Sequence, residues 1–347
     1  MSHVWVRAEQ RPNERRVGLT PEGAAALVAA GHAVTIEESE TRALPLEPYL
    51  VVGAEAAPVG SWPDAPDDAW IFGLKELPDD ETPLRHRHIM FGHAYKGQPD
   101  GARLLHRFAA GGGALYDLEY LVDEDGRRVA AFGYWAGYVG AGMSLACHAA
   151  QRRGEPPQPG RSYASAAEML SWLRDLLGDA MPTTLIIGAH GRTGRGAANL
   201  CAALGIAPTL WDMAETAHGG PFPEILEHEI VLNCILAGPE TPVFVPSDAG
   251  RRARRLTVIG DIACDPTSDF SPIRAYDRPT SWERPALRVH EAPPLDVMAI
   301  DNLPSMLPAE ASRDFAAQLL PSLLALPDGA VWERALQKFR RQAPATP

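Results

Sequence analysis

Cysteine is scarce in this sequence. The chain of 347 residues has four, at Cys147, Cys201, Cys234 and Cys264, and none of them belongs to a C-x-x-C pair. These spacings match neither a zinc-binding motif nor the disulfide framework of a small secreted domain. We therefore expect four reduced thiols and no metal site.

The chain also lacks an excess of positive charge. Its 32 Lys and Arg residues are outnumbered by 44 Asp and Glu residues, so the formal net charge is −12. An acidic surface disfavours nucleic acid and anionic membranes as partners, because both are negatively charged. Residues 1–16 carry charges throughout, unlike a signal peptide. We expect a cytoplasmic protein.

Long uncharged runs are almost absent too. Only the run from Val129 to Ala150 lacks Asp, Glu, Lys and Arg over a length close to the ~20 residues that a membrane-spanning helix needs. It is rich in glycine and alanine and includes Ser144 and His148. Because small residues let two backbones approach closely, this run predicts a buried, tightly packed helix better than a membrane span.

Short apolar strands alternate with helical segments, which is typical of an α/β fold. In the first half, Thr20-Pro21 is expected to start a helix over 22–30. A break rich in Gly, Pro and Arg over 152–161 precedes a second α/β run. The expected strands are 4–6, 33–37, 70–74, 89–92, 184–188, 208–212 and 295–300. The other expected helices are 162–177, 197–204, 310–324 and 331–341.

A glycine-rich turn follows the strand at 184–188. Gly188, Gly191 and Gly194 have the spacing G-x-x-G-x-x-G and lead into a helix. Such a turn lets the backbone and a helix N-terminus approach a pyrophosphate. The next strand ends in Asp212, whose carboxylate would bind ribose hydroxyls and repel a 2′-phosphate. The pattern predicts an NAD site, and the alternative is a glycine turn in an α/β domain that binds no nucleotide.

These patterns predict an α/β protein with two Rossmann-like lobes, parallel sheets flanked by helices, and a cleft between the lobes. Residues 1–140 with 310–347 would form the substrate and catalytic lobe. Residues 160–305 would form the NAD-binding lobe.

Ionisable side chains follow two strands of the first lobe. Lys75 and Glu76 come after one strand, and His93 and Lys96 after another. Ligands of open α/β sheets bind beyond the carboxyl ends of strands, so Lys75 and His93 form a plausible acid/base pair. Arginine forks at Arg16 or Arg128 suit carboxylates. Their sequence context alone favours solvated arginines.

Several of these stretches together resemble the NAD-dependent, lysine-forming saccharopine dehydrogenases, within the alanine dehydrogenase and transhydrogenase group. The matching motifs are Arg7-Ala8-Glu9, Leu19-Thr20-Pro21, Gly73-Leu74-Lys75-Glu76, His93-Ala94-Tyr95-Lys96, Tyr116-Asp117-Leu118-Glu119, Gly126-Arg127-Arg128 and Trp211-Asp212. The resemblance covers nearly the whole chain.

The resemblance implies an enzyme of lysine biosynthesis that reversibly converts saccharopine, NAD and water to lysine, 2-oxoglutarate and NADH. It places the acid/base groups on Lys75 and His93. The substrate contacts that it implies are Arg16, Glu76, Lys96, Glu119, Arg128 and Phe132. The cofactor contacts, from the glycine turn and the resemblance together, are Arg127, Gly188, Gly191, Arg192, Thr193, Gly194, Asp212, Thr216, Ile262, Ile300, Asp301, Asn302 and Leu303.

The expected partners are small molecules, with no nucleic acid and no membrane. We expect a monomer, with a weak dimer as the alternative. Two other functions stay open. One is an alanine- or lysine-type dehydrogenase, or an opine dehydrogenase with another amino acid and keto acid. The other is an NAD-sensing regulatory protein, which the joint presence of Lys75, His93 and the arginines disfavours.

Overall fold

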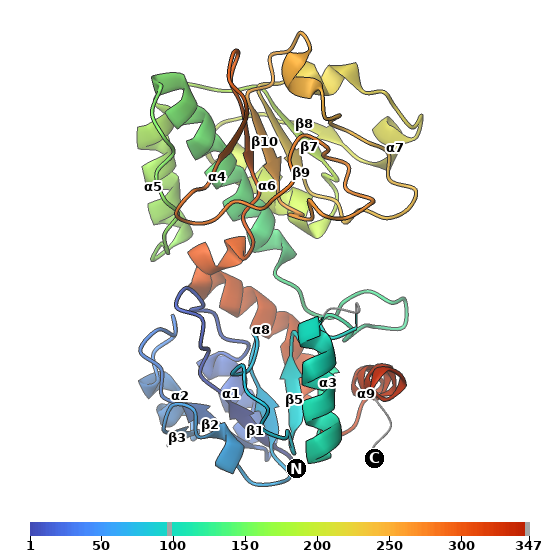
Figure 1. Cartoon of the computed structure of the whole chain (residues 1–347). Helices are drawn as coiled ribbons and strands as arrows, with labels where there is room; N and C mark the ends of the chain where they lie inside the picture. Colours follow the sequence, from blue (N-terminus) through green and yellow to red (C-terminus); the bar gives the residue numbers. More distant parts are fainter. Residues whose placement is uncertain (96–98, 344–347) are drawn as a thin grey trace. The chain divides into compact units, whose positions relative to one another are not determined.

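The computed structural model describes residues 1–95 and 99–343, which form two compact units (Figure 1). The first unit comprises Met1–Ala131 and the chain from Pro308 onward, and the second comprises Phe132–Leu307. The sequence placed the end of the first part at residue 140. Residues 133–140 instead begin a long helix, α4 (Gly133–Arg153), which packs against elements of the second unit.

The first unit is built on a sheet of six parallel strands in the order β3-β2-β1-β4-β5-β6. Its strand order reverses between β1 and β4, which is where doubly wound sheets bind ligands at their carboxyl ends. The strands are β1 (His3–Val6), β2 (Ala33–Glu37), β3 (Glu55–Ala57), β4 (Trp70–Phe72), β5 (Arg87–Met90) and β6 (Ala114–Asp117). The helices are α1 (Pro21–Ala29), α2 (Glu47–Val51), α3 (Pro99–Gly111), α8 (Pro308–Leu324) and α9 (Ala330–Gln342).

The second unit has a six-stranded sheet in the order β11-β12-β10-β9-β7-β8. All neighbouring strands are parallel except β11 and β12. The strands are β7 (Thr184–Ile187), β8 (Thr209–Trp211), β9 (Ile230–Asn233), β10 (Val258–Asp261), β11 (Leu287–His290) and β12 (Leu295–Met298). Besides α4, the helices are α5 (Ala166–Leu177), α6 (Arg192–Ala203) and α7 (Met213–Thr216). The two sheets confirm the predicted α/β class.

Local capping explains where several helices begin. The Thr20 hydroxyl accepts a hydrogen bond from the Gly23 N–H (3.2 Å), so α1 starts as predicted. Helix α5 starts at Ala166, four residues later than expected, because Ser165 caps it through the Glu168 N–H. Helix α6 starts five residues earlier than expected, because Gly191 is its N-cap and the glycine turn continues into the helix.

The glycine-rich run is a buried helix, as predicted. Helix α4 is buried from Gly137 to Ala150 and packs against α6. A Cβ at Gly137 would lie 1.8 Å from the Thr193 carbonyl oxygen, and one at Gly196 would lie 1.9 Å from that of Tyr134. The backbones of α4 and α6 are therefore in direct contact at these two glycines. In the two described stretches of the chain, no helix has the length and apolarity needed to cross a membrane.

Candidate active site

The carboxyl rim of the first sheet brings together most of the ionisable residues predicted for the substrate. Lys75 and Glu76 follow β4, His93 follows β5, and Glu119 lies just beyond β6. The Glu119 carboxylate lies 3.5 Å from His93 Nδ1 through one oxygen. Its other oxygen accepts a hydrogen bond from Arg128 Nη2 at 2.9 Å. Glu119 therefore connects the predicted acid/base histidine to a predicted substrate arginine.

His93 has an unusual backbone for a residue with a side chain. Its φ is +49°, in the left-handed region that few non-glycine residues adopt. Its side chain is 58% exposed, so the imidazole is accessible to solvent at the rim. Lys96, predicted for the same place, lies outside the described residues.

Arg16 is buried rather than solvated. Its guanidinium donates to Glu14 through Nε (2.9 Å) and Nη2 (2.7 Å), and both side chains are less than 5% exposed. Burial by itself would raise the pKa of Glu14, but the charge and hydrogen bonds of Arg16 outweigh it, with a smaller effect from Lys75, and lower it to about 2. The positive charge of Lys75 therefore acts on the same buried pair.

Two predicted residues have neighbours that the sequence does not reveal. Glu76 accepts a hydrogen bond from Arg11. Burial raises the pKa of Glu76, but that hydrogen bond and other contacts bring it below its usual value. Arg127 is 79% exposed and pairs with Asp125 at 3.4 Å.

Asp117 is a further member of the rim that sequence reasoning missed. It ends β6, is 1% exposed, and its Oδ1 accepts a hydrogen bond from the Glu119 N–H (2.9 Å). Burial is the largest influence and raises its pKa to about 6, with the charge of Glu119 acting in the same direction. A polar residue at the end of an otherwise apolar strand is the signal that could have found it.

Asp117→Asn should stabilise the protein increasingly as pH rises from about 4 to about 6. The pKa of Asp117 is higher in the folded protein than in the unfolded chain. Its contribution to stability is therefore fully present at pH values below the unfolded-state pKa, and it is lost as pH rises through the folded-state pKa. Asparagine stays neutral, so its advantage should level off above pH 6 at roughly 3 kcal/mol. Urea unfolding at a series of pH values measures this. Asp67→Asn, at an exposed carboxylate, gives the baseline, and a difference that is independent of pH would contradict the prediction.

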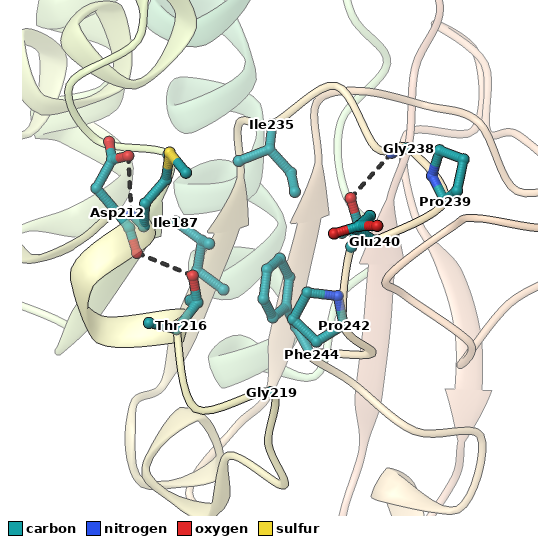
Figure 2. A pocket seen from close by; sticks show the side chains of 14 residues that line it. Ile187, Asp212, Thr216, Gly219, Ile235, Gly238, Pro239, Glu240, Pro242 and Phe244 are labelled. Carbon is teal, nitrogen blue, oxygen red and sulfur yellow. Dashed lines mark hydrogen bonds between the residues drawn. The ribbon is translucent and has the colours of Figure 1, made fainter.

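A pocket of about 500 Å³ lies beside the glycine turn of the second unit (Figure 2). Asp212 and Thr216 line one side of it, the loop from Gly238 to Pro242 lines the other, and Ile187, Ile235 and Phe244 lie between them. Neither these three apolar residues nor the loop from Gly238 to Pro242 was predicted to contact the cofactor. The position of this loop could have revealed it, because the loop follows β9, the strand that pairs with β7. The pocket combines a largely apolar lining with two carboxylates, those of Asp212 and Glu240. Such a lining suits a flat heteroaromatic ring joined to a sugar.

Asp212 ties the glycine turn to the end of β8. Its Oδ2 accepts a hydrogen bond from the His190 N–H (3.0 Å), and its Oδ1 accepts one from the Met213 N–H (2.9 Å). Its backbone carbonyl accepts a hydrogen bond from the Thr216 hydroxyl (3.0 Å). The carboxylate is therefore held at the mouth of the turn, where a ribose would lie.

The turn has the features that a pyrophosphate needs. Gly188 has a φ of +79°, and a Cβ at Gly194 would lie 2.2 Å from the Gly188 carbonyl oxygen. Gly191 caps α6 without a side chain, and Arg192 and Thr193 form the first residues of that helix. First-turn N–H groups of a helix bind anions, so these residues fit a dinucleotide.

The remaining predicted cofactor residues have different surroundings. Ile262 follows β10, and Ile300 and Leu303 follow β12. All three are buried in the core cluster that includes α4. Asp301 is exposed, and Asn302 has a φ of +66°. Phe132, predicted for the substrate, is the N-cap residue of α4 and belongs to the second unit. No cluster of three or more potential His, Cys, Asp or Glu metal ligands occurs within residues 1–95 and 99–343.

Comparison with solved structures identifies the fold. The structure is similar to an L-alanine dehydrogenase, with a TM-score of 0.68 at 18% identity, over 98% of this chain and 93% of that one. It is also similar to a transhydrogenase from Sinorhizobium meliloti, with a TM-score of 0.65 at 16% identity and 97% of each chain covered. Residues 5–139 match the family model of the alanine dehydrogenase/PNT N-terminal domain. The chain thus has the fold of that group.

Sequence comparison then defines the family. The chain is 41% identical to a saccharopine dehydrogenase [NAD(+), L-lysine-forming] of Emericella nidulans, over 99% of this chain and 98% of the relative. It is 42% identical to the protein of the same name from Schizosaccharomyces pombe, with 97% of each chain covered. The chain belongs to the saccharopine dehydrogenase family, which confirms the resemblance found in the sequence.

Proposed function

We propose that this protein catalyses the reversible, NAD-dependent conversion of saccharopine and water to L-lysine and 2-oxoglutarate. The observation that carries the proposal is the rim of the first sheet, where Lys75, His93, Glu119 and Arg128 gather. The relatives that share this sequence at 41–42% identity carry the name of that reaction. The alternative of an alanine dehydrogenase has weaker support, from a solved structure at 18% identity and from the alanine dehydrogenase/PNT family model over residues 5–139.

Each rim residue has a part in the proposed reaction. Lys75 accepts the proton of the secondary amine, and His93 transfers protons during hydration of the imine and collapse of the carbinolamine. Glu119 orients His93 and Arg128 together, since one carboxylate oxygen serves each. Arg128 binds a substrate carboxylate. The fork of Arg16 already holds Glu14, so we propose that this pair sets the charge around the substrate.

The second unit would hold the cofactor. Gly188, Gly191 and Gly194 admit the pyrophosphate, Arg192 and Thr193 contribute the first turn of α6, and Asp212 binds the ribose. NAD, when bound, would accept the hydride from the substrate. We keep the predicted cytoplasmic location, the small-molecule partners and the monomeric state as parts of the proposal.

The assay that tests the proposed function supplies NADH, L-lysine and 2-oxoglutarate and follows NADH absorbance. We expect NADH oxidation that depends on both substrates. A parallel assay with pyruvate and ammonium tests the alanine dehydrogenase alternative. Activity there, without activity on lysine and 2-oxoglutarate, would overturn the substrate assignment.

Asp212→Ser should narrow the preference for NADH over NADPH. The carboxylate favours a free ribose and repels a 2′-phosphate, whereas serine keeps the ability to cap α7. Loss of the charge-assisted hydrogen bond should shift the relative affinity by about 1–3 kcal/mol. Fluorescence titration with both cofactors measures the shift. Equal affinity of the unmodified protein for the two cofactors would refute this role of Asp212.

A further inference from the structure

We propose that Arg7 and Glu9 are positioning residues that hold the peptide of Lys75 from both sides. They belong to the Arg7-Ala8-Glu9 motif directly after β1, for which the proposed function so far has no use. The inference rests on the proposed role of Lys75 as the base. Arg7 and Glu9 are separated from Lys75 by 66 to 68 positions in sequence, and the strand order brings them to it because β1 pairs with β4.

Glu9 holds the N–H side of this peptide segment. Its Oε1 accepts a hydrogen bond from the Leu74 N–H (2.6 Å), and its Oε2 accepts one from the Lys75 N–H (3.0 Å). Its side chain is only 8% exposed. Strand β4 ends at Phe72, so these two N–H groups lie beyond the strand and find their acceptor in one carboxylate. Bonds from a charged acceptor are stronger than neutral ones.

Arg7 holds the carbonyl side. Its Nη2 donates to the carbonyl oxygen of Lys75, and its Nη1 lies 3.5 Å from Glu9 Oε2. The guanidinium is 1% exposed and lies against Gly73, where a Cβ would meet its Nε at 2.3 Å. The glycine of the Gly73-Leu74-Lys75-Glu76 motif therefore makes room for this arginine. The two side chains form an ion pair that encloses the backbone of Lys75.

The neighbouring strand anchors the pair in turn. The carboxylate of Glu37, at the end of β2, accepts a hydrogen bond from the Ala8 N–H at 2.9 Å. It also accepts hydrogen bonds from the Trp62 N–H and the Trp5 indole. The segment between Arg7 and Glu9 is thus fixed to β2 while its side chains hold Lys75. A base must lie within hydrogen-bond reach of the proton that it removes, and a displacement of about 1 Å can cost about 100-fold in rate.

A double-mutant cycle distinguishes a positioning role from a structural one. Glu9→Gln keeps the shape but replaces one acceptor oxygen by an NH₂ group that faces a backbone N–H. Arg7→Lys keeps the charge but loses the fork. We expect each variant to lower kcat by about 10-fold or more and to leave the affinity for NADH unchanged. In a Lys75→Met background, each should cause no further loss, because its effect acts through Lys75.

Tyr49→Phe is the matched stability control. It removes one buried hydrogen bond of the first unit, from the Tyr49 hydroxyl to the Leu19 carbonyl (2.7 Å). We expect it to lower Tm while kcat stays near that of the unmodified protein. The Tm of Glu9→Gln and Arg7→Lys should fall no further than the Tm of Tyr49→Phe. Their loss of kcat is then not explained by unfolding.

Three results would separate the possible failures. If Lys75→Met lowers kcat by about 100-fold while Glu9→Gln and Arg7→Lys keep normal kcat, the positioning role is wrong and the proposed function stands. The positioning role is also wrong if either variant causes the same fold-loss with and without Lys75. If Lys75→Met itself keeps normal turnover, the proposed base is wrong, and the inference fails with it.

Discussion

Replacing Lys75 by methionine should lower kcat for NADH-dependent reductive condensation of lysine and 2-oxoglutarate by about 100-fold or more. That is the usual effect of removing a group that transfers a proton in the transition state. Methionine keeps the length and the apolar stem of lysine but cannot exchange a proton. The peptide of Lys75 is held by Arg7 and Glu9 in either case, so the fold of the rim should persist. Steady-state kinetics over a range of each substrate measure the loss.

Lys338→Met is the control for this result. It is the same substitution at a lysine of helix α9, whose ammonium lies over the rings of Tyr120 (4.8 Å) and Tyr95 (5.7 Å). We expect it to retain near-normal kcat. His93→Gln should slow turnover as well, because it removes the second proton-transferring group. Normal rates in a protein that lacks both Lys75 and His93 would show that the proposed chemistry is wrong.

Gly196→Ala should destabilise the second unit by about 3 kcal/mol or more. Helix propensity alone predicts the opposite, because alanine is favoured over glycine inside a helix by about 1 kcal/mol. The structure opposes that gain, since the new Cβ would lie 1.9 Å from the Tyr134 carbonyl oxygen. Helices α4 and α6 would have to move apart along a buried contact. Thermal unfolding should show a Tm lower by about 6–12 °C.

Gly238→Ala tests whether the effect belongs to the helix contact. Gly238 lies in a loop of the same unit, and a Cβ there meets no atom within 4 Å. We expect a change within about 0.5 kcal/mol. If Gly196→Ala were as stable as Gly238→Ala, the close approach of α4 and α6 would not be what requires glycine at this position.

Local sequence determined much of the fold. The strand at 184–187, the glycine turn and Asp212 at the end of the next strand follow from patterns within about 30 residues. Their structure matches the prediction apart from the start of α6. The helix after Thr20 and the buried glycine-rich helix α4 were equally readable. These features depend on neighbouring residues, through capping, periodicity and side-chain size, and a single sequence contains that information.

Only part of the candidate site could be predicted from the sequence. Sequence reasoning proposed Lys75 and His93 because each follows an apolar strand. It could not find that Glu119 joins His93 to Arg128, or that Arg16 is buried with Glu14. It also missed Asp117, whose burial raises its pKa to about 6. The environment of each group depends on which side chains surround it, and those come from several strands.

Strand order was decided by the tertiary structure alone. Nothing in the residues of β1 and β4 states that they pair, since some 60 residues separate them and β2 and β3 lie between them in sequence. That pairing brings Arg7 and Glu9 to the backbone of Lys75 and places all three where the strand order reverses. The sequence by itself determined the chemical groups and the local elements that carry them. Packing of the sheet decided which groups meet, because contacts between distant strands depend on the whole fold.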